Sequence, residues 1–230
     1  MALVTGASSG MGRAFSLALA KAGVKVLLVA RREENLREAV REITSAGGDA
    51  AYHVGDVRSV PALYDLVDVL LARYKKLDIL INGAGLGYRA PLPELKRAEI
   101  AEMIETDLAA AIYLTQAALP ALERSAPSDI VLVSSIAGLE SYPEGTVYCA
   151  VKAGLVAFGR ALAAEVKPAG IRVMTLCPGS VDTEFFDRFR PSTERPQMLT
   201  AQDVTRELMS ALTAPPNVLR GEIVIRPRVV

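Results

Sequence analysis

Short, almost wholly apolar runs alternate along the chain with longer segments in which apolar residues recur every three or four positions. The runs VLLV at 26–29, ILI at 79–81 and IVLV at 130–133 are typical of strands that are buried on both faces. The longer segments have the period of amphipathic helices. Strands that alternate with helices predict a parallel sheet covered by helices on both sides.

The pattern assigns seven strands and the helices between them. The predicted strands lie at 3–5, 24–30, 50–54, 78–82, 129–134, 171–176 and 222–225, and the predicted helices at 11–22, 33–46, 59–74, 97–124, 147–166 and 202–211. The predicted fold class is therefore α/β, with a doubly wound, seven-stranded parallel sheet. No linker or repeat divides residues 1–230, so we expect a single domain.

One long segment, Val181 to Leu199, has neither period. It contains two prolines and the aromatic residues Phe185, Phe186 and Phe189. Ligands of parallel sheets bind beyond the C-terminal ends of the strands, and this segment directly follows such an end. We therefore expect residues 181–199 to form a lid over a substrate.

Composition narrows the class of partner. The 230 residues are 51% hydrophobic, and 26 Lys and Arg balance 26 Asp and Glu, which argues against a nucleic-acid or anionic-membrane partner. No uncharged apolar run has membrane-spanning length, and no signal peptide precedes the first strand. Cys149 and Cys177 are expected to be reduced thiols of a cytoplasmic protein. With His53 as the sole histidine, no metal site is expected.

A glycine-rich loop connects the first strand to the first helix. Gly6, Gly10 and Gly12 let the backbone turn tightly and approach a phosphate, with Ser8, Ser9 and Met11 between them. The N-terminus of the following helix offers free N–H groups and partial positive charge. This context predicts a dinucleotide pyrophosphate site, although a glycine-rich turn without a ligand is the alternative.

The end of the second strand bears on which dinucleotide binds. An acidic residue there would bind a ribose 2′-hydroxyl, whereas a cation accommodates a 2′-phosphate. This chain has Arg31 and Arg32, whose planar guanidinium groups suit a phosphate. The sequence thus favours NADP over NAD.

Tyr148 and Lys152 lie four residues apart at the start of a predicted helix, so they share one face of it. A phenol beside an ammonium is a candidate proton donor. Lowering a phenol pKa from about 10 to about 7 requires about 4 kcal/mol of phenolate stabilisation, which Lys152 and an oxidised nicotinamide would supply together. The alternative is an ordinary surface pair.

Together these motifs resemble the short-chain dehydrogenase/reductase family in its single-domain, NADP(H)-dependent form, with a Rossmann-type fold. The resemblance covers essentially the whole chain, and its motifs follow one another in the family's order and spacing. They are TGASSGMG at 5–12, DV at 56–57, NGAG at 82–85, SS at 134–135, YCAVK at 148–152 and PGSVDT at 178–183.

The resemblance implies a role for each motif. Tyr148 would be the general acid or base, Lys152 would lower its pKa and bind ribose, and Ser135, preferred over Ser134, would polarise the substrate oxygen. Hydride would pass between NADP(H) and a carbonyl or alcohol substrate. The remaining implied cofactor contacts are Asp56 and Val57 at the adenine, Asn82, Ala84 and Gly85 at the adenosine ribose, and Pro178, Gly179, Val181 and Thr183 at the nicotinamide. Asp56 as a helix cap and Pro178-Gly179 as a simple turn are the alternatives.

Two positions depart from the family pattern. Asp107 stands where many members carry an Asn that supports a proton relay, and Gly83 replaces an Asn beside the sheet. A negative charge at Asp107 would hold the Lys152 proton more tightly and slow the relay. A protonated or water-bridged Asp107 would change little.

The substrate is not named by any motif. Aromatic and leucine residues near the predicted strand ends suggest an apolar or amphipathic carbonyl compound or alcohol, as for a carbonyl reductase or a 3-oxoacyl reductase, although they also fit plain lid packing. These residues are Leu86, Tyr88, Leu139, Tyr142, Phe185, Phe186 and Phe189. Small residues in the helices at 97–124 and 147–166 suggest a homodimer or homotetramer. The competing hypothesis is a non-catalytic NADP-binding sensor or scaffold of the same fold.

Overall fold

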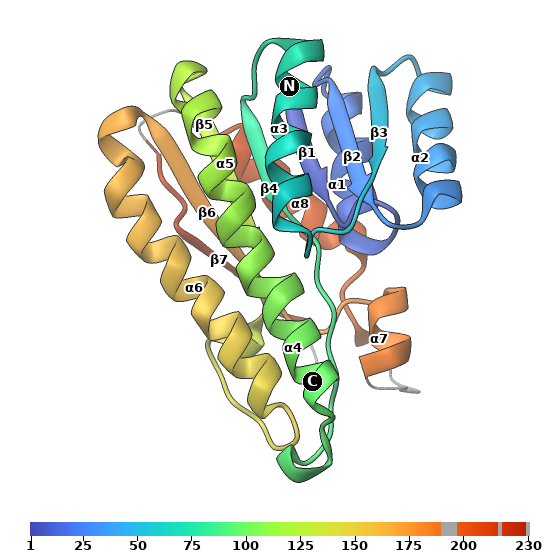
Figure 1. The fold of residues 1–230 in the computed structure, drawn as a ribbon, viewed down its shortest axis with the longest axis vertical. Helices are drawn as coiled ribbons and strands as arrows, with labels where there is room; N and C mark the ends of the chain where they lie inside the picture. Colours follow the sequence, from blue (N-terminus) through green and yellow to red (C-terminus); the bar gives the residue numbers. More distant parts are fainter. Residues whose placement is uncertain (190–196, 216–217, 229–230) are drawn as a thin grey trace.

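The computed structural model describes residues 1–189, 197–215 and 218–228. Within them, seven parallel strands form one sheet in the order β3-β2-β1-β4-β5-β6-β7 (Figure 1). The strands are β1 (Ala2–Thr5), β2 (Val26–Ala30), β3 (Ala50–Val54), β4 (Ile79–Asn82), β5 (Ser128–Val133), β6 (Ile171–Pro178) and β7 (Glu222–Ile225). The predicted Rossmann-type, doubly wound α/β class is confirmed.

The helices follow the predicted order with one addition. They are α1 (Gly10–Lys21), α2 (Glu33–Ser45), α3 (Val60–Tyr74), α4 (Arg97–Met103), α5 (Ala110–Arg124), α6 (Thr146–Val166), α7 (Glu184–Phe189) and α8 (Ala201–Leu212), with short 3-10 turns at Leu92–Glu94, Ile136–Gly138 and Lys167–Ala169. Helix α7 lies inside the segment predicted to be an irregular lid. Residues 190–196 of that predicted lid lie outside the described residues.

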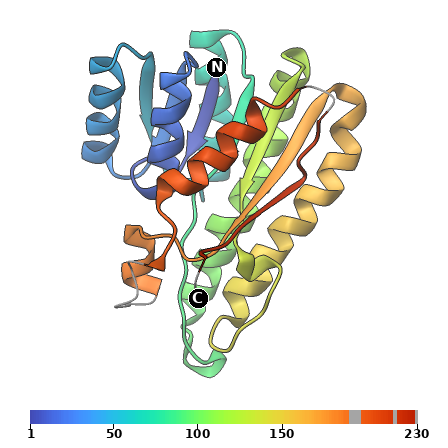
Figure 2. The ribbon, with the colours of Figure 1, turned by 180° about the vertical axis from the view of Figure 1, so that it is seen from behind.

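Two hydrophobic cores lie on opposite faces of the sheet. Successive strand residues point to opposite faces, so Leu3 and Leu27 join one core while Val4 and Leu28 join the other. Helices α3, α5 and α6 cover the first core, and helices α1, α2 and α8 cover the second (Figures 1 and 2). Burial on both faces explains why the strands read as continuous apolar runs.

Helix α6 is apolar along most of its length. The span Thr146–Ala169 is long and apolar enough to cross a membrane by length and composition alone. In the fold, Leu155, Leu162 and Val166 of this helix belong to the core between the sheet and helices α3, α5 and α6. A buried core helix therefore accounts for its composition.

The long helix predicted at 97–124 has a break in its hydrogen-bonding pattern. Between α4 and α5 the segment Ile104–Ala109 is π-helical. A π turn widens the helix locally and often occurs at functional sites. Asp107 lies in this turn and is 1% exposed, so the irregularity places a carboxylate inside the protein.

Strands β1 and β4 meet where the order of connection reverses, and the backbone loops that follow them are in close contact. A Cβ on Gly6 would lie 2.5 Å from the carbonyl oxygen of Gly83, and one on Gly12 would lie 2.4 Å from that of Gly6. The Thr5 hydroxyl accepts hydrogen bonds from the backbone N–H groups of Gly83 and Ala84 at 3.1 and 3.2 Å. Small residues and one threonine thus hold this junction, where doubly wound folds bind their ligands.

We expect Gly12→Ala to lower the free energy of unfolding by about 2–3 kcal/mol, because the new methyl group must push the Gly6 backbone aside. Gly23→Ala is the matched control, since Gly23 has φ +82° with open space around it. Its cost is about 1–2 kcal/mol, from conformation alone. Urea unfolding measures both, and a Gly12→Ala variant no less stable than the control would contradict the close contact.

Candidate functional site

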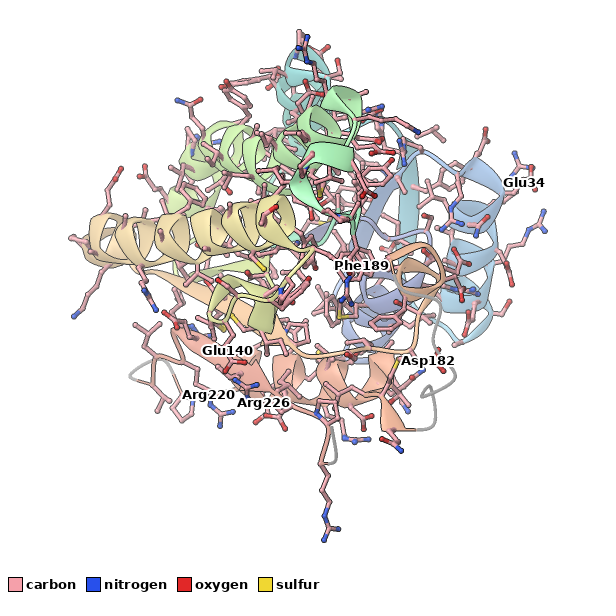
Figure 3. The ribbon with its side chains drawn as sticks, turned by 90° about the horizontal axis from the view of Figure 1, so that it is seen from below. Glu34, Glu140, Asp182, Phe189, Arg220 and Arg226 are labelled. Atoms are coloured by element: carbon pink, nitrogen blue, oxygen red, sulfur yellow. The ribbon has the colours of Figure 1, made fainter. Side chains whose placement is uncertain are left out.

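The sequence-predicted site residues lie together at the C-terminal edge of the sheet. The loops after β1, β2, β3, β4, β5 and β6 carry them, and parallel strands bring these ends to one side. Figure 3 looks onto this edge from below, and Phe189 of helix α7 lies near its middle.

Tyr148 and Lys152 lie in the first two turns of α6 and are 7% and 4% exposed. The Lys152 ammonium donates a hydrogen bond to the carbonyl oxygen of Val133, at the end of β5, over 3.1 Å. The Ser134 hydroxyl donates to the Lys152 carbonyl over 2.9 Å. These contacts fix the start of α6 against the end of β5, so both side chains are held in place from two directions.

Asp107 forms a buried ion pair with Lys152. Its Oδ2 lies 2.9 Å from Lys152 Nζ, and its Oδ1 accepts a hydrogen bond from the Leu86 N–H over 2.8 Å. The contact between Oδ2 and Nζ lacks hydrogen-bond geometry, so Oδ2 has no hydrogen-bond donor within the described residues. Gly85 borders the pair, since a Cβ there would lie 3.0 Å from Oδ2. Asp107 thus contacts Lys152 directly, whereas burial raises the pKa of its carboxyl group, and both expectations for its ionisation stay predictions.

The pKa of Tyr148 differs from the expectation. We expected Lys152 and an oxidised nicotinamide together to lower it, whereas in the protein alone burial and then the negative charge of Asp107 raise the pKa of this phenol well above its ordinary value. Lys152 lies 5.7 Å from the centre of the Tyr148 ring, while its charge is paired with Asp107. The nearby Ser135 hydroxyl acts in the opposite direction and lowers the pKa. Tyr148 is therefore a protonated phenol at neutral pH.

The two serines after β5 have different surroundings. Ser134 is 3% exposed, and its hydroxyl is committed to the backbone of α6. The Ser135 Oγ accepts from the Ala137 N–H over 3.1 Å and is close enough to Tyr148 to affect its pKa. This arrangement supports the choice of Ser135 over Ser134 as the group beside the phenol.

Aromatic side chains of α7 cover Tyr148. The ring centres of Phe185 and Phe189 lie 5.9 and 4.9 Å from that of Tyr148. A Cβ on Gly87 would lie 2.7 Å from the Phe189 ring, so the glycine permits this close packing. Most of the predicted pocket residues belong to this same apolar cluster; Leu86, Tyr88, Tyr142, Phe185 and Phe189 pack in it, and Phe186 contacts Phe189.

The glycine-rich loop has the geometry that a phosphate site requires. Gly6 and Gly10 have φ of +68° and +53°, which glycine adopts without steric cost. Ser9 is the N-cap of α1 and forms no side-chain capping hydrogen bond, and the first turn of α1 has no acidic residue. The N–H groups at this helix end and its partial positive charge thus fit a nucleotide phosphate.

Arg32 lies at this loop, and each of the two arginines after β2 is paired with a carboxylate. Arg32 donates to Ser9 Oγ over 2.6 Å and to Glu184 Oε2 over 2.7 Å. Arg31 Nη1 lies 3.8 Å from Glu102 Oε1. Sequence reasoning missed Glu184 and Glu102, because no local pattern marks an acid that pairs with a distant arginine.

Asp56 also has a partner that the sequence analysis missed. Arg58 donates to both of its carboxylate oxygens, with the shortest distance at 2.6 Å, and the Arg58 N–H donates to Oδ1 over 3.0 Å. These hydrogen bonds hold the pKa of Asp56 below its ordinary value. Ser59, not Asp56, is the N-cap of α3, so the helix-cap alternative for Asp56 is wrong.

The remaining predicted cofactor contacts border the same space. Asn82 donates to Thr115 Oγ1 over 3.1 Å and is 5% exposed. The Gly179 N–H donates to the Ile225 carbonyl over 2.8 Å, and Val181 forms an isolated bridge with Leu199. A Cβ on Gly10 would lie 3.3 Å from the Thr183 side chain, so the segment after β6 reaches the glycine-rich loop. The other residues predicted here are Val57, Ala84, Gly85 and Pro178, all at strand ends.

Cys149 packs in the apolar cluster around Tyr148, whereas Cys177 lies in β6. Cys149 and Cys177 are free and buried, as expected, and burial raises the pKa of Cys177 to about 11. Among the described residues, no group of three or more His, Cys, Asp or Glu side chains is arranged to hold a metal ion.

Comparison with known proteins places these features in a family. The model of the short chain dehydrogenase family matches residues 1–194. An uncharacterized oxidoreductase of Staphylococcus aureus (strain MW2) is 31% identical over 228 residues, covering 99% of this chain and 96% of the relative. The NADP-dependent 3-hydroxy acid dehydrogenase of Schizosaccharomyces pombe is 34% identical over 239 residues, covering 98% and 91%.

A solved structure has nearly the same fold. The alcohol dehydrogenase of the archaeon Thermococcus sibiricus, complexed with 5-hydroxy-NADP, is 29% identical and has a TM-score of 0.93. The similarity covers 100% of this chain and 97% of that one. The seven-stranded sheet and its helices are therefore shared along the full chain.

The buried ion pair leads to a prediction about stability. We expect Lys152→Met to lower the free energy of unfolding at pH 7 by about 3–5 kcal/mol, because the Asp107 charge is left buried without a partner. Asp107→Leu combined with Lys152→Met should recover most of this loss, since an apolar pair carries no buried charge. Urea unfolding of wild type and the variants measures the difference.

The pH dependence of the Lys152→Met variant provides the control. Burial raises the pKa of Asp107 and Lys152 lowers it, so removing Lys152 raises it further. A carboxyl group with a raised pKa in the folded state stabilises the fold at low pH and loses that effect as pH rises through its folded pKa. Relative to wild type, Lys152→Met should therefore gain stability between pH 7 and pH 5. An unchanged difference would show that Asp107 is not charged at pH 7.

Proposed function

The chain belongs to the short-chain dehydrogenase/reductase family of oxidoreductases, and we propose that it transfers a hydride between NADP(H) and a carbonyl or alcohol substrate. The observation that carries this proposal is the placement of a buried Tyr148 next to Ser135 and Lys152 at the edge where the glycine-rich loop lies. A proton donor beside a dinucleotide loop is the arrangement that carbonyl reduction requires.

Two kinds of observation support NADP as the cofactor. Arg31 and Arg32 follow β2, and Arg32 also contacts Ser9 of the glycine-rich loop. A guanidinium at this position accommodates a 2′-phosphate. The 3-hydroxy acid dehydrogenase relative is NADP-dependent, and the structural relative was solved with an NADP derivative.

The other cofactor contacts that we propose come from the loops at the same edge. The glycine-rich loop would hold the pyrophosphate, the loops after β3 and β4 would hold adenosine, and residues 178–183 would hold the nicotinamide end. When bound, NADPH supplies the hydride.

The protein's own groups would manage the proton and the developing charge. Tyr148 would donate its hydroxyl proton to the substrate oxygen, and Ser135 would donate a hydrogen bond to the same oxygen as it becomes negative. The positive charge of Lys152 would stabilise the phenolate, and the negative charge of Asp107 would offset part of that effect.

The raised pKa of Tyr148 favours reduction at neutral pH. A reductase needs the phenol protonated at the start of each turnover, whereas oxidation of an alcohol needs the phenolate as base. Burial and Asp107 both favour the protonated form. We therefore propose carbonyl reduction as the direction of the reaction near pH 7 and alcohol oxidation at alkaline pH.

The substrate class follows from the cluster around Tyr148. Its side chains are apolar or aromatic, including Leu86, Tyr88 and the α7 phenylalanines. An apolar or amphipathic carbonyl compound fits these surroundings, as for a carbonyl reductase or a 3-oxoacyl reductase. We also propose assembly through α5 and α6, where Ile112 and Tyr113 of α5 are 36% and 40% exposed.

One observation favours a second candidate function. Phe185 and Phe189 cover Tyr148, and Asp107 pairs with the ammonium that would assist it. A nucleotide-binding sensor or scaffold of this fold would need neither an accessible phenol nor a free ammonium. Turnover with any ketone decides between the two candidates.

We expect Tyr148→Phe to lower kcat for ketone reduction by NADPH at least about 100-fold, the contribution of a general acid. The Kd for NADPH should change less than about threefold, since the removed hydroxyl serves the substrate. A ketone panel with absorbance at 340 nm and a fluorescence titration provide the measurements. If wild type binds NADPH but reduces no ketone, the sensor function replaces the proposed one.

Asp107→Asn tests whether the charge of Asp107 raises the pKa of the Tyr148 phenol. Loss of the carboxylate charge should lower the pKa of Tyr148, so the rise of kcat/KM for alcohol oxidation with pH should move about one unit lower. Asp129→Asn is the matched control: Asp129 is also buried and ion-paired, with Arg172, but lies at the opposite end of β5. An unchanged profile in Asp107→Asn would show that Asp107 does not act on Tyr148.

A further inference from the structure

The ion pair between Arg32 and Glu184 joins the two ends of the site. Arg32 follows β2 and contacts the glycine-rich loop, whereas Glu184 is the first residue of α7. The guanidinium donates to Glu184 Oε2 over 2.7 Å, and the two residues are separated by 152 positions in the sequence. The carboxylate thus contacts the guanidinium that we assign to the 2′-phosphate.

Helix α7 is held in place by contacts with other parts of the chain. It has only six residues, and helices of this length are not stable by themselves. At its start, Glu184 pairs with Arg32, while Phe185 and Phe189, one turn apart, pack on Tyr148. The ion pair therefore helps to keep the phenyl rings over the phenol.

A carboxylate and a phosphate compete for the same guanidinium fork. Each can present two oxygen atoms to two parallel N–H groups, and the phosphate carries more charge. Glu184 also adds a negative charge where a 2′-phosphate would sit. Each effect opposes binding of a nucleotide that carries this phosphate, and neither affects one that lacks it.

We propose that Glu184 competes with the 2′-phosphate of the nucleotide for Arg32. When the phosphate binds, it displaces Glu184 from Arg32 and so loosens α7 over Tyr148. This inference rests on the proposed use of NADP. Under this inference, Glu184 determines specificity for the nucleotide, although this residue lies outside the glycine-rich loop and the arginine pair. It also couples recognition of the adenosine end to exposure of the proton donor.

Calorimetric titration at low salt with adenosine 2′,5′-bisphosphate and with 5′-AMP tests the competition. Glu184→Gln should bind the bisphosphate about threefold more tightly than wild type, as expected for loss of an exposed competing ion pair. It should bind 5′-AMP with unchanged affinity. In an Arg32→Ala background, Glu184→Gln should have no effect on either ligand.

Glu34→Gln is the matched control for charge. Glu34 lies two residues after Arg32, on the outer side of α2 (Figure 3), and pairs with Arg37 rather than with Arg32. It should leave both affinities unchanged. If Glu34→Gln tightened bisphosphate binding as much as Glu184→Gln does, long-range charge would explain the effect and the proposal would be overturned. Unchanged or weaker bisphosphate binding in Glu184→Gln would also overturn it.

Hydrogen exchange of residues 181–189 tests the loosening of α7 without any turnover. Adenosine 2′,5′-bisphosphate should increase exchange in this segment of wild type, and 5′-AMP should not. Equal exchange with both ligands would overturn the coupling. Equal affinity of the wild type for both ligands would overturn the proposed use of NADP itself. If the wild type prefers the bisphosphate and Glu184→Gln leaves that preference unchanged, only the proposed competition is overturned.

Discussion

The buried contact between Lys152 and Asp107 is the interaction on which the site depends. Both side chains are almost fully removed from water, and a buried charge is tolerated only when a partner offsets the loss of hydration. The π turn brings Asp107 inward, the Val133 carbonyl accepts a hydrogen bond from Lys152, and Gly85 leaves room for both. The pair contributes to the charge that Tyr148 experiences, and burial is the larger cause of the raised pKa of this phenol.

Helix α7 connects this buried pair to the surface. Its phenyl rings exclude water from the Tyr148 hydroxyl, and burial is the largest cause of the raised pKa. Its first residue contacts Arg32 at the nucleotide end. Any movement of α7 would therefore change both the access to the phenol and its acidity, because hydration stabilises the phenolate. Under both proposals, one short helix would therefore affect the specificity for the nucleotide and the control of the proton donor.

The sequence predicts well what depends on local pattern. All seven strands were expected within a few residues. The central strands are apolar runs buried on both faces, whereas β3 and β7 are only partly buried, and the glycine-rich loop was expected from its place after the first strand. The π turn at Ile104–Ala109 was missed, since one widened turn hardly alters helical periodicity. The partners of Arg32 and Asp56 were missed too, because exposed and half-buried ion pairs leave no periodic signal. Oligomeric state and cellular location stay predictions.

The substitution at position 107 had the least predictable consequence. Asp and Asn are nearly equal in size, so sequence reasoning could place the residue but not its ionisation, which depends on burial and on the distance to Lys152. A buried ion pair contributes little to stability compared with an apolar pair of the same volume. The carboxylate is thus better explained by its effect on charge than by its effect on folding. Under the proposed carbonyl reduction, a carboxylate at this position would make the proton donor a weaker acid and would favour the return to a protonated phenol after each cycle.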